Sequence, residues 1–177
     1  MTSTSSLEAL GRDLVATAVL RGDFLLRSGQ RSTYYIDKYL FTTEPDLLRR
    51  LAAALAPMLP DRVQRLAGPV LGAVPLVTAL SLTTGLPFVV VRTERPKEYG
   101  TAKQIEGKLA AGDRVWLVED VVTTGGAGIA SLDTLEATGA RVVGAAAVVD
   151  REQGGAEAFA ARGVPFRALF TKTSLGL

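Results

Sequence analysis

Two patterns of apolar positions recur along the chain. In one, apolar residues recur at helical spacing, and in the other they form the unbroken runs that are typical of buried strands. Leu7, Leu10 and Leu14 recur on one face of a helix that Ser5 or Ser6 caps and that we expect to end near residues 21–22. A second helix is predicted at residues 45–58, with proline at its start. Apolar runs predict strands at residues 63–67, 86–92, 115–120, 141–150 and 164–170, and helices are expected after residues 72 and 127 and at 156–162. Strands alternating with helices predict an α/β fold with a parallel, Rossmann-like central sheet flanked by helices.

One of these strands leads directly into a polar loop. Residues 115–127 read Val-Trp-Leu-Val-Glu-Asp-Val-Val-Thr-Thr-Gly-Gly-Ala, and a helical pattern begins near Ile129. The order is therefore strand, two carboxylates, a loop of hydroxyls and glycines, and a helix start. In a parallel sheet this order places the polar residues at the carboxyl end of a strand, where such sheets bind ligands.

This loop has the chemistry of a phosphate site. Gly125–Gly126 allow a tight bend that directs backbone N–H groups to one point, and Thr123–Thr124 add hydroxyl donors beside a helix start. Glu119 and Asp120 would repel a phosphate, but they suit the two hydroxyls of a ribose or a hydrated Mg²⁺. We expect a ligand with a phosphate at one end and vicinal hydroxyls beside it. The alternative is an ordinary strand-to-helix turn whose glycines serve packing.

Composition narrows the chemistry further. The 177 residues include no cysteine and no histidine, which excludes disulfides, thiolate nucleophiles, imidazole bases and the usual zinc sites. The net charge of +2 is nearly balanced and basic residues form no tract, so we expect no nucleic-acid partner. The N-terminal residues lack a signal-peptide pattern, and no apolar stretch is long enough to span a bilayer. The sequence therefore predicts a cytoplasmic protein without membrane contact, with residues 1–177 forming a single domain.

The stretch at residues 115–127 resembles the phosphoribosyl-pyrophosphate (PRPP) signature of type I phosphoribosyltransferases. The resemblance implies the fold of that family, with the acidic pair on the ribose hydroxyls and the following loop on the 5′-phosphate. The PRPP-binding residues that it implies are Glu119, Asp120, Val121, Val122, Thr123, Thr124, Gly125, Gly126 and Ala127, with Asp120 also catalytic.

An N-terminal segment adds a second resemblance. Two short strand-like pieces flank a turn at Ser28–Gly29, which alone would predict a hairpin covering the sheet. The segment carries more charged and aromatic residues than a cover requires: Arg27, Arg31, Tyr34, Tyr35, Asp37 and Lys38. Residues 22–37, Gly-Asp-Phe-Leu-Leu-Arg-Ser-Gly-Gln-Arg-Ser-Thr-Tyr-Tyr-Ile-Asp, resemble the small hood (about residues 20–40, joined by C-terminal elements) that closes over the pyrimidine in orotate phosphoribosyltransferases. The match implies that Arg27 contacts PRPP and orotate and that Tyr35 and Ile36 border orotate.

Two loops at predicted strand ends extend this resemblance. Residues 68–75, Gly-Pro-Val-Leu-Gly-Ala-Val-Pro, form an ordinary turn or a ligand loop, and they resemble the family's pyrophosphate loop. That match implies that amides around Leu71 and Gly72 face the diphosphate; some members carry a lysine where Leu71 stands. Val-Asp-Arg-x-x-Gly, which begins at Val149, resembles the base-recognition segment, so Arg151 is implied to face orotate together with Thr123. A planar guanidinium is well suited to bind a carboxylate through two hydrogen bonds.

Residues 93–108 are charged and lack apolar periodicity, which is typical of a solvated loop or of a mobile lid. Arg-x-x-Arg-Pro-Lys-Glu-Tyr-Gly-Thr resembles the mobile catalytic loop of orotate phosphoribosyltransferases, with one extra residue between Arg92 and Lys97. The match implies that Lys97 is the catalytic lid lysine and that Arg92, Arg95 and Tyr99 also bind PRPP.

Together the segments imply transfer of ribose 5-phosphate from PRPP to N1 of orotate, giving orotidine 5′-monophosphate and pyrophosphate in pyrimidine biosynthesis. The family further implies Mg²⁺ bound mainly through PRPP, with no metal ligand assigned to the protein, and a homodimer whose lid loops are shared between subunits. The alternatives are a phosphoribosyltransferase for another base and a non-catalytic nucleotide-binding regulator of the same fold. A dinucleotide-binding domain is a third, for which Gly126-x-Gly128-x-x-Ser131 is a near match only.

Overall fold

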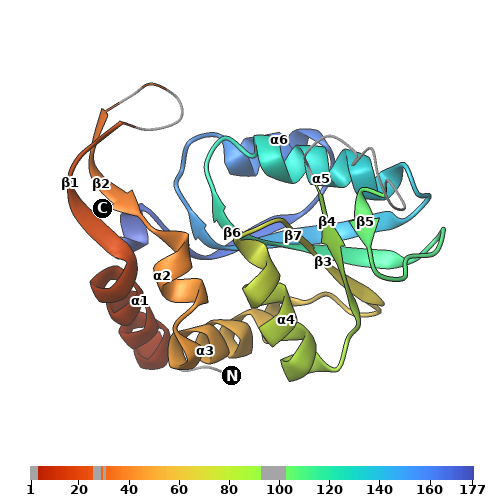
Figure 1. The fold of residues 1–177 in the computed structure, drawn as a ribbon, viewed down its shortest axis with the longest axis horizontal. Coiled ribbons are helices and arrows are strands. Elements are labelled where there is room, and N and C mark those ends of the chain that lie inside the picture. The colour runs from red at the N-terminus through yellow and green to blue at the C-terminus, as the bar shows by residue number, and fades with distance from the viewer. Residues whose placement is uncertain (1–3, 26–28, 30, 93–102) are drawn as a thin grey trace.

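One six-stranded sheet forms the centre of the computed structural model, which describes residues 4–25, 29, 31–92 and 103–177 (Figure 1). The strand order is β5-β4-β3-β6-β7-β8. Neighbouring strands from β4 to β8 are parallel, and β5 is antiparallel to β4. The strands are β3 (Arg65–Pro69), β4 (Phe88–Val91), β5 (Ile105–Glu106), β6 (Arg114–Val122), β7 (Arg141–Asp150) and β8 (Phe166–Thr171). The predicted α/β fold with a mostly parallel central sheet is confirmed.

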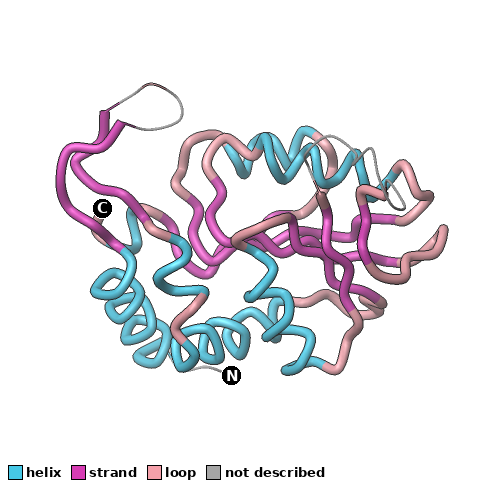
Figure 2. The backbone as a smooth tube through the Cα atoms, viewed as in Figure 1, coloured by secondary structure: helices cyan, strands magenta, loops and turns pink. Residues whose placement is uncertain are grey.

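Helices cover both faces of this sheet (Figures 1 and 2). Helices α3 (Pro45–Leu55, extended by the 3₁₀ turn Ala56–Met58) and α4 (Ala73–Thr84) lie on one face, and α5 (Gly126–Glu136) and α6 (Gly155–Ala161) lie on the other. Strand β6 is buried on both sides, since Trp116 and Val118 pack in the first apolar cluster and Val115 and Leu117 in the second. Its unbroken apolar run is what a parallel strand between two helix layers requires.

A hood of four elements stands beside the sheet. It consists of α1 (Thr4–Ala18), the antiparallel hairpin β1 (Val19–Leu25) and β2 (Arg31–Ile36), and α2 (Lys38–Thr42). The C-terminal 3₁₀ turn Thr173–Leu175 contacts α1. The β1–β2 hairpin and the start of α2 fall in the range predicted for the hood, about residues 20–40, whereas α1 lies outside that range.

Several boundaries differ from the sequence prediction. The first helix ends at Ala18, not near residues 21–22, because Gly22 lies in an irregularity of the β1–β2 pairing rather than at a helix end. Strand β6 continues through the acidic pair to Val122. The stretch 93–108, predicted as a loop throughout, contains strand β5, which is held by pairing with β4.

Among the described helices, none has the length and apolar character needed to cross a membrane.

Candidate active site

Helices α4, α5 and α6 follow β3, β6 and β7, so all three begin at the carboxyl edge of the sheet. Their N-cap residues are Gly72, Gly125 and Gly154, and none of these helix starts has a hydrogen bond from a capping side chain. The first backbone N–H groups of a helix have no partner within the helix and favour an anion. The edge predicted to bind the ligand therefore carries several positive helix ends.

The loop after β6 encloses a cavity of about 480 Å³ lined by Glu119 and residues 121–128. Gly125 adopts a φ of 81°, a left-handed conformation that other residues rarely adopt, and this bend starts α5. Gly126 leaves its side of the cavity open, because a Cβ there would meet only Thr124 Oγ1, at 3.9 Å. The structure thus gathers the predicted phosphate-loop residues, from Val121 to Ala127, around one cavity of a size that suits a small phosphorylated ligand.

The two carboxylates of the signature point in different directions. Glu119 lines the loop cavity, whereas Asp120 contacts Lys38 and Gly72 on the side of α2 and α4. Both are buried, with exposed fractions of 5% and 3%. Alternation along β6 explains the divergence, since successive side chains of a strand project from opposite faces.

Glu119 is buried, and no cation of the described residues is in hydrogen-bonding contact with it. Its Oε1 has no hydrogen-bond partner among the described residues. Burial, reinforced by the charge of Asp120 and opposed by that of Lys38, raises the pKa of Glu119 to about 8. Strongly raised carboxyl pKa values are common at ligand sites, where a polar group is kept ready for a ligand.

Lys38 joins the hood to this site and was not among the predicted site residues. Its Nζ lies 3.0 Å from Asp120 Oδ2. Burial lowers the pKa of Lys38, but the attraction of the Asp120 carboxylate outweighs it, so the net pKa lies above its usual value. A Cβ on Gly72 would overlap Asp120 Oδ2 and would lie 2.8 Å from Lys38 Cδ and Cε. Glycine at position 72 is what lets the three residues meet.

Arg151 forms a second contact between hood and sheet. It follows β7, its N–H donates to Val122 O at 2.9 Å, and its side chain is buried against Tyr34 of β2. Arg151 Nη2 donates to Tyr34 Oη at 3.4 Å, with the guanidinium carbon 5.3 Å from the centre of the ring. Arg151 Nε is buried and has no partner among the described residues. A buried guanidinium with a free donor is the group expected to receive an anion from a ligand.

The remaining predicted residues lie in several places. Leu71 is exposed between β3 and α4, as a ligand loop requires. Tyr35 is partly exposed and its ring packs 5.7 Å from that of Phe24, whereas Ile36 is buried in the apolar cluster. The residue of this run that contacts Arg151 is Tyr34, and the roles of Tyr35 and Ile36 stay predictions.

Arg92 lies at the end of β4, where its Nη1 is 3.6 Å from Glu106 Oε1 of β5. The sequence did not reveal this contact, because β5 itself was not predicted. The roles predicted for Arg27, Arg95, Lys97 and Tyr99 concern positions outside the described residues.

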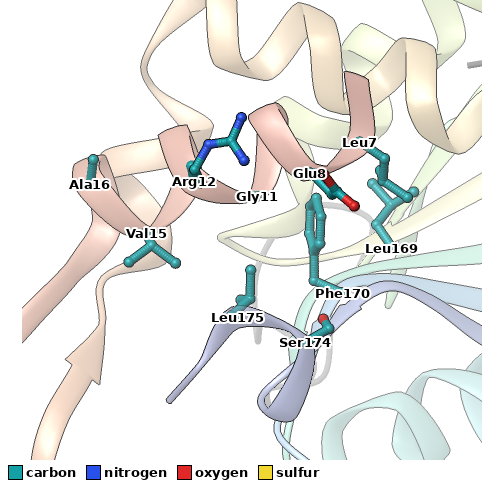
Figure 3. Close-up of a pocket in the computed structure, with 10 residues that line it drawn as sticks. All are labelled: Leu7, Glu8, Gly11, Arg12, Val15, Ala16, Leu169, Phe170, Ser174 and Leu175. Atoms are coloured by element: carbon teal, nitrogen blue, oxygen red, sulfur yellow. The ribbon is translucent and has the colours of Figure 1, made fainter. Parts of the chain in front are cut away.

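A second cavity, of about 500 Å³, lies between α1 and the C-terminal segment (Figure 3). Phe170 and Leu175 project toward α1 there, and the lining is mostly apolar, with Glu8 and Arg12 near it. None of the predicted site residues that the structure describes borders this cavity, so we do not assign the active site to it.

Comparisons with known proteins agree with this geometry. Residues 46–160 match the family model described as "Phosphoribosyl transferase domain". Orotate phosphoribosyltransferase of Thermococcus gammatolerans is 47% identical over 157 residues, which are 86% of this chain and 82% of the relative. That of Halobacterium salinarum is 45% identical over 175 residues, 99% of this chain and 98% of the relative.

Solved structures give the same result. Orotate phosphoribosyltransferase of Mycobacterium tuberculosis is 32% identical, with a TM-score of 0.85 over 97% of this chain and 99% of the other. The same M. tuberculosis protein has been solved in complex with PRPP, and that structure matches at 31% identity with a TM-score of 0.82 over 97% of this chain and 99% of the other.

Proposed function

The chain belongs to the orotate phosphoribosyltransferase family, and we propose that it transfers ribose 5-phosphate from PRPP to N1 of orotate. The products are orotidine 5′-monophosphate and pyrophosphate, in the pyrimidine pathway. The observation that carries this proposal is the loop cavity after β6, which has the start of α5 beside it and, on its wall, a buried Glu119 oxygen that has no partner in the described part of the chain. This combination matches a ligand with a phosphate at one end and hydroxyls at the other.

The reaction makes specific demands on these residues. Breaking the anomeric C–O bond leaves positive charge on the ribose ring and negative charge on the departing diphosphate. No protein nucleophile is needed, in keeping with a chain that has neither histidine nor cysteine. Catalysis instead requires that the two substrates be held in line and that the leaving charge be stabilised.

The placement of the elements supports the proposed PRPP contacts. The loop Thr123–Ala127 and the first turn of α5 hold the 5′-phosphate, since these residues line the cavity and a helix start favours an anion. Glu119 accepts a hydrogen bond from a ribose hydroxyl, which gives its buried oxygen a partner. Asp120 holds the other face of the ribose. The amides of Leu71 and Gly72, at the start of α4, face the diphosphate.

The orotate contact is assigned to Arg151. Its Nε and Nη2 lie on the same side of the guanidinium and can form two hydrogen bonds to the carboxylate of orotate, while the second N–H of Nη2 stays on Tyr34. A base without that carboxylate would leave a buried guanidinium unpaired, which is unfavourable. This contact is therefore the source of the preference for orotate, with Thr123, Tyr35 and Ile36 bordering the ring.

Mg²⁺ is the proposed cofactor. The protein offers it single carboxylate oxygens and not a complete set of ligands among the described residues. Within the described residues no cluster of three or more His, Cys, Asp or Glu could hold a metal ion. The Glu119 carboxylate oxygen, to which no described residue bonds, is the kind of hard oxygen that Mg²⁺ and its bound water favour. Glu119 and Asp120 would thus hold the ion through water and the ribose hydroxyls, with the diphosphate as its main ligand. When bound, Mg²⁺ neutralises part of the charge on the leaving group.

The assembly and location rest on family resemblance. We assign Lys97 as the lid cation on the departing pyrophosphate, with Arg27, Arg92, Arg95 and Tyr99 on PRPP, in a homodimer whose lids serve the neighbouring site. The chain acts as one domain, since one apolar cluster joins Leu14 of the hood to Trp116 of the sheet. A cytoplasmic location stays a prediction.

The substrate is tested by following ultraviolet absorbance of purified protein with PRPP, Mg²⁺ and one base at a time. Orotate should be consumed, and uracil and adenine should not. Turnover of another base in preference to orotate would leave the family assignment unchanged and refute orotate as the acceptor. Absence of turnover with every base would favour the non-catalytic regulator.

Shared sites are tested by mixing two inactive chains, Lys97→Ala and Arg151→Ala. If the lid of one subunit serves the other, hybrid dimers contain one site with both native residues and recover part of the activity. A mixture that stays as inactive as its components would contradict sharing.

A further inference from the structure

The diphosphate loop, residues 68–75, contains no charged side chain: it reads Gly-Pro-Val-Leu-Gly-Ala-Val-Pro. Its amides and the start of α4 carry only partial charges, whereas a departing diphosphate carries several full negative charges. Transfer reactions of this kind gain most from a full cation near the developing charge. A side chain from another element has to supply that cation if the protein contributes one.

Lys38 is a lysine that reaches this loop from α2. Its Cδ and Cε lie beside Gly72, 2.8 Å from where a Cβ of residue 72 would stand, so its aliphatic stem fills the space of the missing side chain. The start of α2 is fixed locally, because Asp37 caps it by accepting the Tyr39 N–H at 3.0 Å and Phe41 is fully buried. The lysine therefore projects from an anchored element and not from a free loop.

The ammonium of Lys38 is only partly used by its ion pair. Nζ lies 3.0 Å from Asp120 Oδ2, and the exposed fractions of the two side chains are 36% for Lys38 and 4% for Asp120. An ammonium group has three N–H donors. One can stay on Asp120 while the open side donates to an anion at the start of α4.

We propose that Lys38 is a diphosphate-binding residue, which supplies from the hood the positive charge that the loop 68–75 lacks. The inference rests on the proposed function, because its ligand is the diphosphate of PRPP or the free pyrophosphate product. It also explains why residue 72 is glycine, since any side chain there would displace the lysine stem from the loop. The competing explanation is that Lys38 only neutralises and orients Asp120 for the ribose.

Two ligands separate these explanations: inorganic pyrophosphate with Mg²⁺, which has no ribose, and ribose 5-phosphate, which has no diphosphate. Their dissociation constants are measured by calorimetry for the unsubstituted protein, Lys38→Met and Lys38→Arg. Loss of a charge-assisted contact should weaken pyrophosphate about tenfold or more in Lys38→Met, with partial recovery in Lys38→Arg. Ribose 5-phosphate affinity should change less than about twofold, since the fragment lacks the group that Lys38 binds.

Arg65→Met provides a matched control. It removes another partly buried ion pair, in which Arg65 Nε lies 2.6 Å from Asp113 Oδ2 at the amino end of β3, away from the site. It should leave both dissociation constants unchanged. If Lys38→Met does not fold, Lys38→Gln serves in its place, because the amide can still donate to Asp120 and only the charge is lost.

An unchanged pyrophosphate affinity, or equal weakening of both ligands, would overturn the proposal in favour of a role on Asp120 alone. Turnover of orotate by the unsubstituted protein is measured separately. Its absence would overturn the proposed function, while the two titrations would still decide the role of Lys38.

Discussion

Replacing Glu119 by glutamine should make the ligand-free protein more stable at neutral and alkaline pH. Glu119 is 5% exposed, its Oε1 has no partner among the described residues, and burial, followed by the charge of Asp120, raises its pKa from 4.5 to about 8. Because the folded-state pKa is raised, the folded protein holds the proton more tightly than the unfolded chain. The stability from this group is fully present below pH 4.5 and is lost as the pH rises through 8.

The size of the effect follows from the shift. Each pKa unit corresponds to about 1.4 kcal/mol, so a shift from 4.5 to about 8 costs about 5 kcal/mol at alkaline pH and about 3 kcal/mol at pH 7. Glutamine has nearly the same shape and no charge, so it avoids this cost. The advantage of the variant should therefore grow by about 3 kcal/mol between pH 5 and pH 8.

Urea unfolding without Mg²⁺ or PRPP, repeated at intervals from pH 5 to pH 8, measures this difference. Asp113→Asn is the control, because the Ala110 N–H and then Arg65 lower the pKa of Asp113. Stability from a lowered carboxyl pKa is lost only as the pH falls through that pKa, so this variant should stay parallel to the unsubstituted protein over the whole range. If the free energy of unfolding of Glu119→Gln also stays parallel to that of the unsubstituted protein, Glu119 is ionised in the folded protein. The account of a protonated, ligand-ready carboxyl would then be wrong.

Three further substitutions test the site. Gly72→Ala should lower the free energy of unfolding by about 1–3 kcal/mol and weaken PRPP binding, because its methyl group would overlap Asp120 Oδ2. Unfolding and binding curves that match those of the unsubstituted protein would contradict that packing. Gly126→Ala is the matched case, because the space around its methyl group is open. The melting temperature should stay unchanged while the KM for PRPP rises about tenfold. An unchanged KM would contradict the assignment of the 5′-phosphate to this loop. Arg151→Lys keeps the charge but loses the planar fork, so the KM for orotate should rise about 10- to 100-fold with little change for PRPP; steady-state kinetics with equal changes for both substrates would argue against the carboxylate contact.

The order of elements and the location of the site could be predicted from the sequence because both depend on local patterns. Each apolar run became a strand of the sheet, and the signature lies at the carboxyl edge because strand, carboxylates, loop and helix follow one another directly. Strand β7 runs from Arg141 to Asp150, as predicted, since its apolar residues are bounded by polar ones. The phosphate-loop prediction rests on neighbours in the chain, and local sequence was sufficient for it.

Features that depend on tertiary contacts could not be predicted. Strand β5 is only two residues long and exists because Ile105 and Glu106 pair with β4. Gly22 suggested the end of a helix, but in the structure it marks an irregular position of a hairpin strand.

The partners of the site side chains belong to this second class. The density of charge in the hood indicated that the segment serves a ligand, yet nothing in the sequence distinguished Lys38 from its neighbours. Its importance comes from Asp120 and Gly72, which lie far along the chain. Glu119 and Asp120 are adjacent in sequence, but the alternation of β6 gives them different neighbours, the loop cavity for Glu119 and Lys38 for Asp120.

The most direct test of the central claim is a phosphorus NMR time course of PRPP and Mg²⁺ with the purified protein, with and without orotate. With orotate, the diphosphate signals of PRPP should give way to free pyrophosphate, matched one to one by a new 5′-phosphate monoester that co-migrates with orotidine 5′-monophosphate. Without orotate, PRPP should persist. Release of pyrophosphate at the same rate in both samples, or no reaction in either, would contradict transfer to orotate.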